Sequence, residues 1–166
     1  MQWLEQDHVR EFWDNSQEHK DDIRIFAEGR LQASSYFDGV FDYWIGSHDA
    51  EQFCLLMTSR LASDDELPAL WKQQLSKTGK TISIDFCIGD VRFLGKGLAA
   101  ETLNRFIEFF RSNIESVSDT FFIDPDATNT KAQHVYAKAG FKPVGRYVMP
   151  SGVFNGHETL LMIRQF

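Results

Sequence analysis

The chain has 166 residues, a formal net charge of −7 and a hydrophobic content of 43%. This length suits a single domain with a sizeable core, and no apolar run reaches membrane-spanning length. We therefore expect one domain over residues 1–166, located in the cytoplasm and without a membrane partner. The acidic balance and the lack of a basic stripe make nucleic acid an unexpected partner, whereas a small cationic substrate is compatible with it.

Metal and disulfide chemistry are not expected. The two cysteines, Cys54 and Cys87, are too few and too isolated for a disulfide framework or a zinc site. The five histidines show no metal-ligand spacing.

The apolar periodicity predicts alternating helices and strands. In chain order, the expected elements are an N-terminal helix, a helix over residues 20–32, strands over 40–45 and 53–58, a loop or short helix over 64–75, a strand over 81–88, a helix over 98–112, a strand over 120–124, a helix over 129–139, and strands over 143–149 and 158–163. In the helix over 20–32, Leu31 is expected to face inward. The pattern indicates an α/β fold, a mixed sheet with helices on both faces.

The strand over 81–88 runs into a glycine-rich turn and then directly into a helix. Such a turn presents free backbone N–H groups and the positive end of a helix dipole, which together bind a pyrophosphate. Arg92 and Lys96 add positive charge there. Glycines also serve ordinary tight turns, so this motif alone is a weak signal. The expected cradle consists of Arg92, Phe93, Leu94, Gly95, Lys96, Gly97 and Leu98.

A second motif follows on the helix over 129–139. It begins with Asp124-Pro125, continues with Asn129, and ends in Tyr136-x-Lys138-x-Gly140-Phe141. The two motifs together resemble the GNAT superfamily of acetyl-CoA-dependent N-acetyltransferases. The resemblance implies a mixed central sheet with a splayed pair of strands, and acetyl-CoA as the cofactor. Such domains normally open with a strand, whereas this sequence begins within the first helix. Either the start of the sequence is truncated or misassigned, or the sheet lacks that strand.

The resemblance also implies cofactor contacts outside the turn. Asn129 matches the family's pantetheine-binding Asn, although Asn is also a preferred helix cap. Tyr136 lies seven residues later, almost two helical turns, and matches the acid that protonates the departing thiolate. The alternative for Tyr136 is a core tyrosine. Further contacts are expected from the backbone of Phe86, Cys87 and Ile88 and from Lys138.

Asp85 is the most informative single residue. Aspartate is depleted in strand interiors, and this one lies among apolar neighbours, so burying it costs energy. A partly desolvated carboxylate beside the cofactor could accept the ammonium proton or hold the amine. The alternative is a structural Asp paired with a lysine or a backbone amide. Cys87 lies on the same face of the strand, where a small buried filler is a better interpretation than a covalent acyl carrier.

Residues around these motifs narrow the resemblance to the aminoglycoside 6′-N-acetyltransferases. The match includes the opening Trp3-Leu4-Glu5-Gln6-Asp7-His8-Val9 and is tightest from Asp85 to Phe141. It implies that Asp85 is the base or amine-binding group, that Asp124 engages amino groups of the drug, and that Trp71 packs on its sugar rings. Trp71 could equally shield the core from solvent.

The expected function is therefore acetyl transfer to a primary amine, with the 6′-amine of an aminoglycoside as acceptor and direct attack in a ternary complex. Alternative acceptors are a siderophore precursor, a polyamine or a protein N-terminus. A non-catalytic acyl-CoA-binding module is a further alternative, although binding alone requires neither Asp85 nor Tyr136. The protein is expected to be a monomer or a homodimer.

Overall fold

The computed structural model describes residues 2–166. The chain forms two compact units. The first contains the residues up to Ser59 together with Asp85–Leu94, and the second contains Arg60–Ile84 together with Gly95–Phe166. A single domain over the whole chain stays a prediction.

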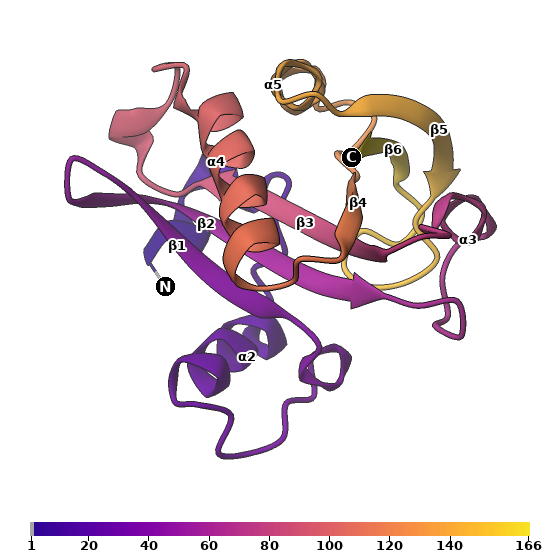
Figure 1. Ribbon diagram of the computed structural model, residues 1–166. Helices are drawn as coiled ribbons and strands as arrows, with labels where there is room; N and C mark the ends of the chain where they lie inside the picture. Colours follow the sequence, from indigo (N-terminus) through magenta and orange to yellow (C-terminus); the bar gives the residue numbers. More distant parts are fainter. Residues whose placement is uncertain (1) are drawn as a thin grey trace. The chain divides into compact units, whose positions relative to one another are not determined.

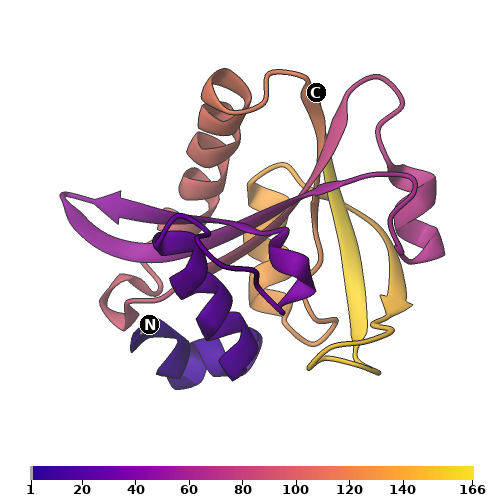
Figure 2. The same ribbon diagram turned by 90° about the horizontal axis from the view of Figure 1, so that it is seen from below.

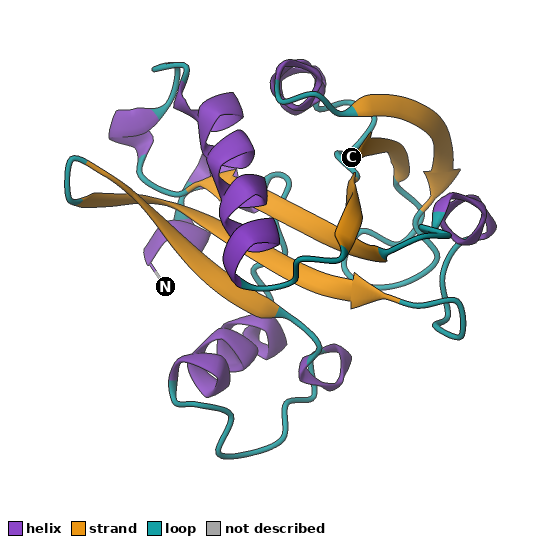
Figure 3. Cartoon of the chain, in the orientation of Figure 1, coloured by secondary structure: helices purple, strands orange, loops and turns teal. Residues whose placement is uncertain are grey.

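The elements follow the expected order closely (Figures 1 and 3). They are η1 (Gln2–Glu5), α1 (Asp7–Arg10), α2 (Gln17–Ala27), η2 (Phe37–Gly39), β1 (Asp42–His48), β2 (Glu51–Leu61), α3 (Ala69–Gln74), β3 (Lys80–Ile88), η3 (Val91–Phe93), α4 (Leu98–Asn113), β4 (Ser118–Ile123), α5 (Thr130–Lys138), β5 (Lys142–Val148) and β6 (Glu158–Gln165).

The six strands form a sheet of order β1-β2-β3-β4-β6-β5. The β3–β4 pair is parallel, and the β1–β2, β4–β6 and β5–β6 pairs are antiparallel, so the sheet is mixed as predicted. The first element of the described residues is η1. No helix in this described part of the chain has the length and apolar character needed to cross a membrane.

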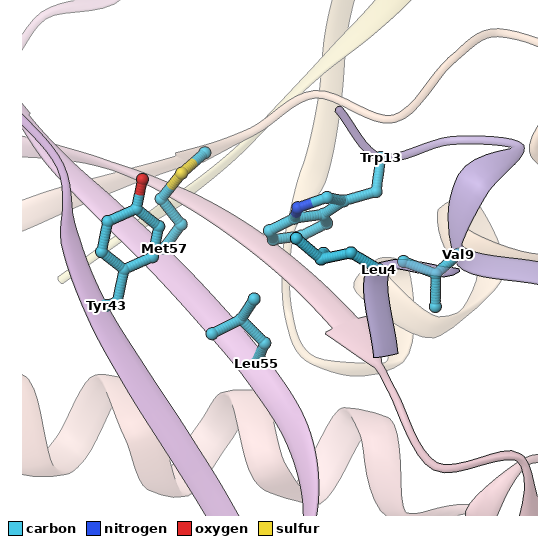
Figure 4. Packing of buried hydrophobic residues seen from close by; sticks show 6 residues of the cluster. All are labelled: Leu4, Val9, Trp13, Tyr43, Leu55 and Met57. Atoms are coloured by element: carbon cyan, nitrogen blue, oxygen red, sulfur yellow. The ribbon is translucent and has the colours of Figure 1, made fainter. Parts of the chain in front are cut away.

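The core of the first unit lies between the N-terminal helices and the β1–β2 hairpin. In Figure 4, Trp13 lies over Leu4, and Tyr43 of β1 lies beside Met57 of β2. Each of these four side chains is at most 8% exposed. Leu4 lies in a 3₁₀ turn that is followed by a short α-helix, where the sequence predicted a single N-terminal helix.

α2 ends earlier than the sequence predicted. Ser16 begins the helix by accepting a hydrogen bond from the His19 backbone N–H. Gly29 adopts a left-handed φ of 81°, and the Arg30 N–H bonds back to the Ile25 carbonyl, which ends the helix at Ala27. The prediction that Leu31 faces inward was wrong: it lies beyond the helix end and is 88% exposed.

The β1–β2 hairpin carries one irregularity, and it lies in β2. Gly46 pairs with Cys54 and Ser47 with Gln52, so Phe53 has no partner in β1. A bulge of this kind turns a backbone group away from the ladder. Here the Phe53 carbonyl accepts hydrogen bonds from the N–H groups of Gly89 (2.8 Å) and Asp90 (3.1 Å), directly after β3.

In the second unit, α4 has the predicted apolar stripe. Its buried side chains are Leu103, Phe106, Ile107 and Phe110. In the same unit, α3 lies alongside β5 (Figure 2). A Cβ on Gly145 of β5 would come 3.2 Å from the Leu70 side chain of α3. Trp71 of the same helix joins a core cluster with Phe122, Leu161 and Ile163.

Candidate active site

The side chains of β3 become less buried from Asp85 onward. Residues 81–84 are buried, whereas residues 85–88 are only partly buried. The registered pairs with β4 end at Ser83, opposite Phe122, although β3 continues to Ile88. β4 itself ends at Ile123, so Asp85 lies where β3 continues beyond its paired neighbour, and the splay of two strands stays a prediction.

Burial raises the pKa of the Asp85 carboxyl from 3.8 to about 6. The side chain therefore changes charge near neutral pH, where a general base has to work. The negative charge of Asp85 also raises the pKa of the Tyr36 hydroxyl. The pKa of the Tyr36 hydroxyl is raised, first by burial, then by the Asp14 carboxylate, with which it forms a hydrogen bond, and further by Asp85.

Asp14 and Tyr36 are residues that sequence reasoning missed. Both belong to the first unit, as Asp85 does, and His19 connects them. The His19 ring lies 4.7 Å from the Tyr36 ring, and its Nδ1 is 2.6 Å from the Asp14 carbonyl oxygen. His19 Nε2 is buried and has no hydrogen-bond partner. These residues lie at helix ends and in a connection, where no periodic pattern marks them.

The thiol of Cys87 is not poised as a nucleophile. Burial raises its pKa to about 12, so it remains protonated at neutral pH. The side chain packs against the core cluster of the first unit. This environment fits the predicted role as a filler.

The start of the turn is held by a network of hydrogen bonds. The Asp90 carboxylate accepts from the Arg92 N–H (2.9 Å) and from its guanidinium (2.6 Å), and Glu51 lies 2.7 Å from the same guanidinium. Arg92 thus already has two carboxylate partners. For its guanidinium to bind a pyrophosphate, as predicted, these ion pairs have to exchange.

The second half of the turn fits a bound pyrophosphate. Gly95 and Gly97 adopt left-handed φ values of 72° and 76°, and a Cβ on either would meet nothing within 4 Å. α4 begins at Leu98, and Gly97 offers no side-chain cap for its first N–H groups. Open space beside two glycines and an uncapped helix N-terminus is the arrangement that receives an anion.

On α5, both motif residues are where the spacing predicted. Asn129 caps the helix, since its Oδ1 accepts from the Ala132 N–H at 3.0 Å. Tyr136 is 6% exposed and lies 6.4 Å from the Phe141 ring, while Lys138 is exposed in the last turn. Asn129 is therefore a helix cap and Tyr136 a buried side chain. The roles of both residues in binding or using the cofactor stay predictions.

The two expected substrate residues of the second unit share a partner. The Tyr147 hydroxyl donates to the Asp124 carboxylate at 2.6 Å, and the Tyr147 ring lies 5.9 Å from that of Trp71. Trp71 is only 8% exposed, yet its indole N–H has no hydrogen-bond partner. The structure thus places Trp71 in the core rather than in a loop, and its contact with sugar rings stays a prediction.

The candidate residues divide between the two units. Asp85, the strand backbone after it and the turn as far as Leu94 belong to the first unit. Gly95 to Leu98 and the α5 residues belong to the second.

Comparison with known proteins identifies the class. The sequence model of the acetyltransferase (GNAT) domain matches residues 1–149. The chain therefore belongs to the GNAT acetyltransferases, and its cofactor is acetyl-CoA. No curated protein sequence matches it significantly.

Several solved structures share the fold. An aminoglycoside N(6′)-acetyltransferase from Legionella pneumophila is 23% identical with a TM-score of 0.69, and the match covers 98% of this chain and 82% of that one. The aminoglycoside acetyltransferase AAC(6′)-Ib, in complex with coenzyme A and kanamycin, is 20% identical with a TM-score of 0.69, covering 98% and 85%. A chimera of spermidine N-acetyltransferase SpeG from Vibrio cholerae and hSSAT is 14% identical with a TM-score of 0.60, covering 87% and 75%.

Proposed function

We propose that this acetyltransferase acetylates a primary amine, and that the acceptor is the 6′-amine of an aminoglycoside. The observation that carries the proposal is Asp85: a half-buried carboxylate with a pKa of about 6, at the point where β3 leaves its pairing with β4. An amine is protonated at neutral pH and has to lose a proton before it can attack a carbonyl. A carboxylate with this pKa is suited to accept that proton.

The remaining roles fall to residues that the motifs supply. Acetyl-CoA supplies an activated acetyl group, which passes to the amine nitrogen as the C–S bond breaks. A backbone N–H of Phe86 or Cys87 stabilises the negative charge on the carbonyl oxygen. The Tyr136 hydroxyl donates its proton to the departing sulfur. The amides from Gly95 to Leu98 hold the pyrophosphate, and Asn129 holds the pantetheine arm.

The choice of acceptor rests on charge. Asp14 and Asp85 both raise the pKa of the Tyr36 hydroxyl, so two carboxylates act on one buried phenol, whereas the third, Asp22, is already paired. Arg30 lies 3.6 Å from Asp22. An excess of carboxylates attracts ammonium groups, which aminoglycosides carry in number. The fold shared with acetyltransferases described as acting on aminoglycosides supports the same choice.

The test is thiol release from acetyl-CoA, run with purified protein against aminoglycosides, spermidine and hydroxylamines, with product masses read from the same samples. Single acetylation of drugs that bear a 6′-amine, and none of matched drugs with a 6′-hydroxyl, is the expected result. Turnover only with spermidine or hydroxylamines would show that the acceptor is not an aminoglycoside. Tight acetyl-CoA binding by calorimetry without turnover on any amine would favour a non-catalytic module.

A further inference from the structure

The two edges of the sheet are protected to different degrees. β5 carries Lys142, Pro143 and Arg146, and its own bulge leaves Val144 without a partner in β6. A positive charge, a proline and a bulge on the edge strand are the devices by which proteins prevent a sheet from pairing with another chain. This edge is therefore blocked.

The opposite edge, β1, has none of these devices. Its sequence, Asp42-Tyr-Trp-Ile-Gly-Ser-His48, contains no lysine, arginine or proline. The hairpin bulge lies in β2, so β1 itself is continuous from end to end. Among residues 2–166, β2 is the only strand that pairs with β1 (Figure 1). In an antiparallel ladder, alternate residues point their N–H and C=O groups to the other side, so an unblocked edge of this kind can accept another strand.

One face of β1 is partly exposed. Ile45, in the middle of the strand, is 51% exposed. The largest side chain of the strand, Trp44, is directed toward β2, because its indole N–H donates to Thr58 Oγ1 at 3.0 Å. Val40, just ahead of the strand, is 55% exposed and extends the apolar surface.

The strand is complementary to itself. If two copies pair antiparallel about a two-fold axis at Ile45, the two Ile45 side chains lie opposite each other. Asp42 of each copy then faces His48 of the other, which places a carboxylate opposite an imidazole. Trp44 faces Gly46, which has no side chain to obstruct it. Directly opposed pairs of this kind are what stabilises an antiparallel ladder.

We infer that two copies of this chain associate through their β1 strands, antiparallel and centred on Ile45, so that their sheets become continuous. The contact is isologous, because the same residues are used on both copies, and it closes as a dimer. With the β1 edge used and the β5 edge blocked, the dimer has no further edge on which to grow.

The first experiment compares Ile45→Lys with Val148→Lys by sedimentation equilibrium. Val148 is the matched control, since it lies on the blocked edge and is 60% exposed. The unaltered protein should sediment at twice 19.1 kDa. Ile45→Lys places two like charges opposite each other and should weaken the dimer by at least about tenfold. Val148→Lys should leave it unchanged.

A second experiment does not depend on the lysine variant folding. On mild oxidation, Ile45→Cys should form a covalent dimer on a non-reducing gel, whereas Val148→Cys and the unaltered protein, with buried Cys54 and half-buried Cys87, should not. A protein that sediments as a monomer at every concentration would overturn the inference. So would a dimer that survives Ile45→Lys, or cross-linking through Val148→Cys instead.

Discussion

Trp3 occupies the space where the side chain of residue 89 would otherwise lie. The backbone of Gly89 passes so close to the indole that a Cβ there would overlap it. Gly89 is the first residue after β3, and its N–H bonds to the Phe53 carbonyl. We therefore expect Gly89→Ala to lower the free energy of unfolding by about 1–3 kcal/mol, because either the indole or the turn has to move.

Urea denaturation measures this change. Adding Trp3→Ala to Gly89→Ala makes room for the new methyl group, so the double variant should be less destabilised than the sum of the two single variants. Strict additivity would show that the overlap is relieved elsewhere.

Asp85 should give the reaction a pH dependence. Only the carboxylate can accept a proton, so kcat/KM should rise with pH and its lower limb should bend near about pH 6. Asp85→Asn should abolish most of the activity and remove the bend. A bend that persists in Asp85→Asn would assign it to another group.

The same group affects stability with a defined sign. The native pKa of Asp85 lies above its ordinary value of 3.8, so the folded protein binds more protons between these two values. Its contribution to the free energy of unfolding is therefore present at low pH and is lost as pH rises from about 4 to about 6. Urea titrations of the wild type and Asp85→Asn across this range should diverge in that direction.

Tyr136→Phe separates proton donation from packing. The side chain is buried, so phenylalanine keeps its apolar shape, and urea denaturation of the variant measures packing separately from activity. We expect kcat to fall by more than tenfold with little change in acetyl-CoA affinity, since a positioned acid contributes about 10²–10⁴ in rate. Equal losses in both quantities would remove the acid role.

Gly97 tests the cradle. Its positive φ and the open space around it mean that a valine strains the turn and fills the space proposed for the pyrophosphate. Gly97→Val should weaken acetyl-CoA binding by at least about tenfold in calorimetry. Gly156→Val, which has the same backbone geometry and open surroundings far along the chain, is the matched control and should bind normally.

Arg30 should be important for stability. It lies 3.6 Å from the fully buried Asp22, donates to the Phe41 carbonyl and stacks 5.1 Å from the Phe26 ring. Arg30→Met leaves the Asp22 carboxylate with Tyr43 as its hydrogen-bond partner and should cost about 3 kcal/mol.

The control for Arg30 is an exposed pair. Arg24→Met removes a surface ion pair with Asp21 and should cost less than about 1 kcal/mol. Similar losses for both variants in urea titrations would contradict the special role of Arg30.

Much of the fold was predictable because its signals are local. The apolar stripe of α4 and the turn at Gly95 and Gly97 mark their elements directly, and the spacing from Asn129 to Tyr136 marks α5. Asp85 was identifiable because a charge inside an apolar strand needs an explanation. The family resemblance then supplied roles that no spacing contains.

What could not be predicted depends on contacts distant in sequence. The inward orientation expected for Leu31 failed because Gly29 ends α2 two residues before it. Trp71 is buried by Phe122 and Tyr147, which follow it by many residues. The proximity of Asp14 to Tyr36 depends on a stacked histidine in another element. None of these relationships leaves a periodic trace in the sequence.

The extra residue in β2 has a consequence for how the hairpin finds its pairing. One carbonyl, that of Phe53, receives two N–H groups from Gly89 and Asp90, which lie far along the chain. A hairpin shifted by one residue would direct that carbonyl into its own ladder and leave both amides without an acceptor. The hydrogen bonds from the turn after β3 therefore favour the native register of the β1–β2 hairpin. That register is fully stabilised only after residues 89 and 90 have folded against β2.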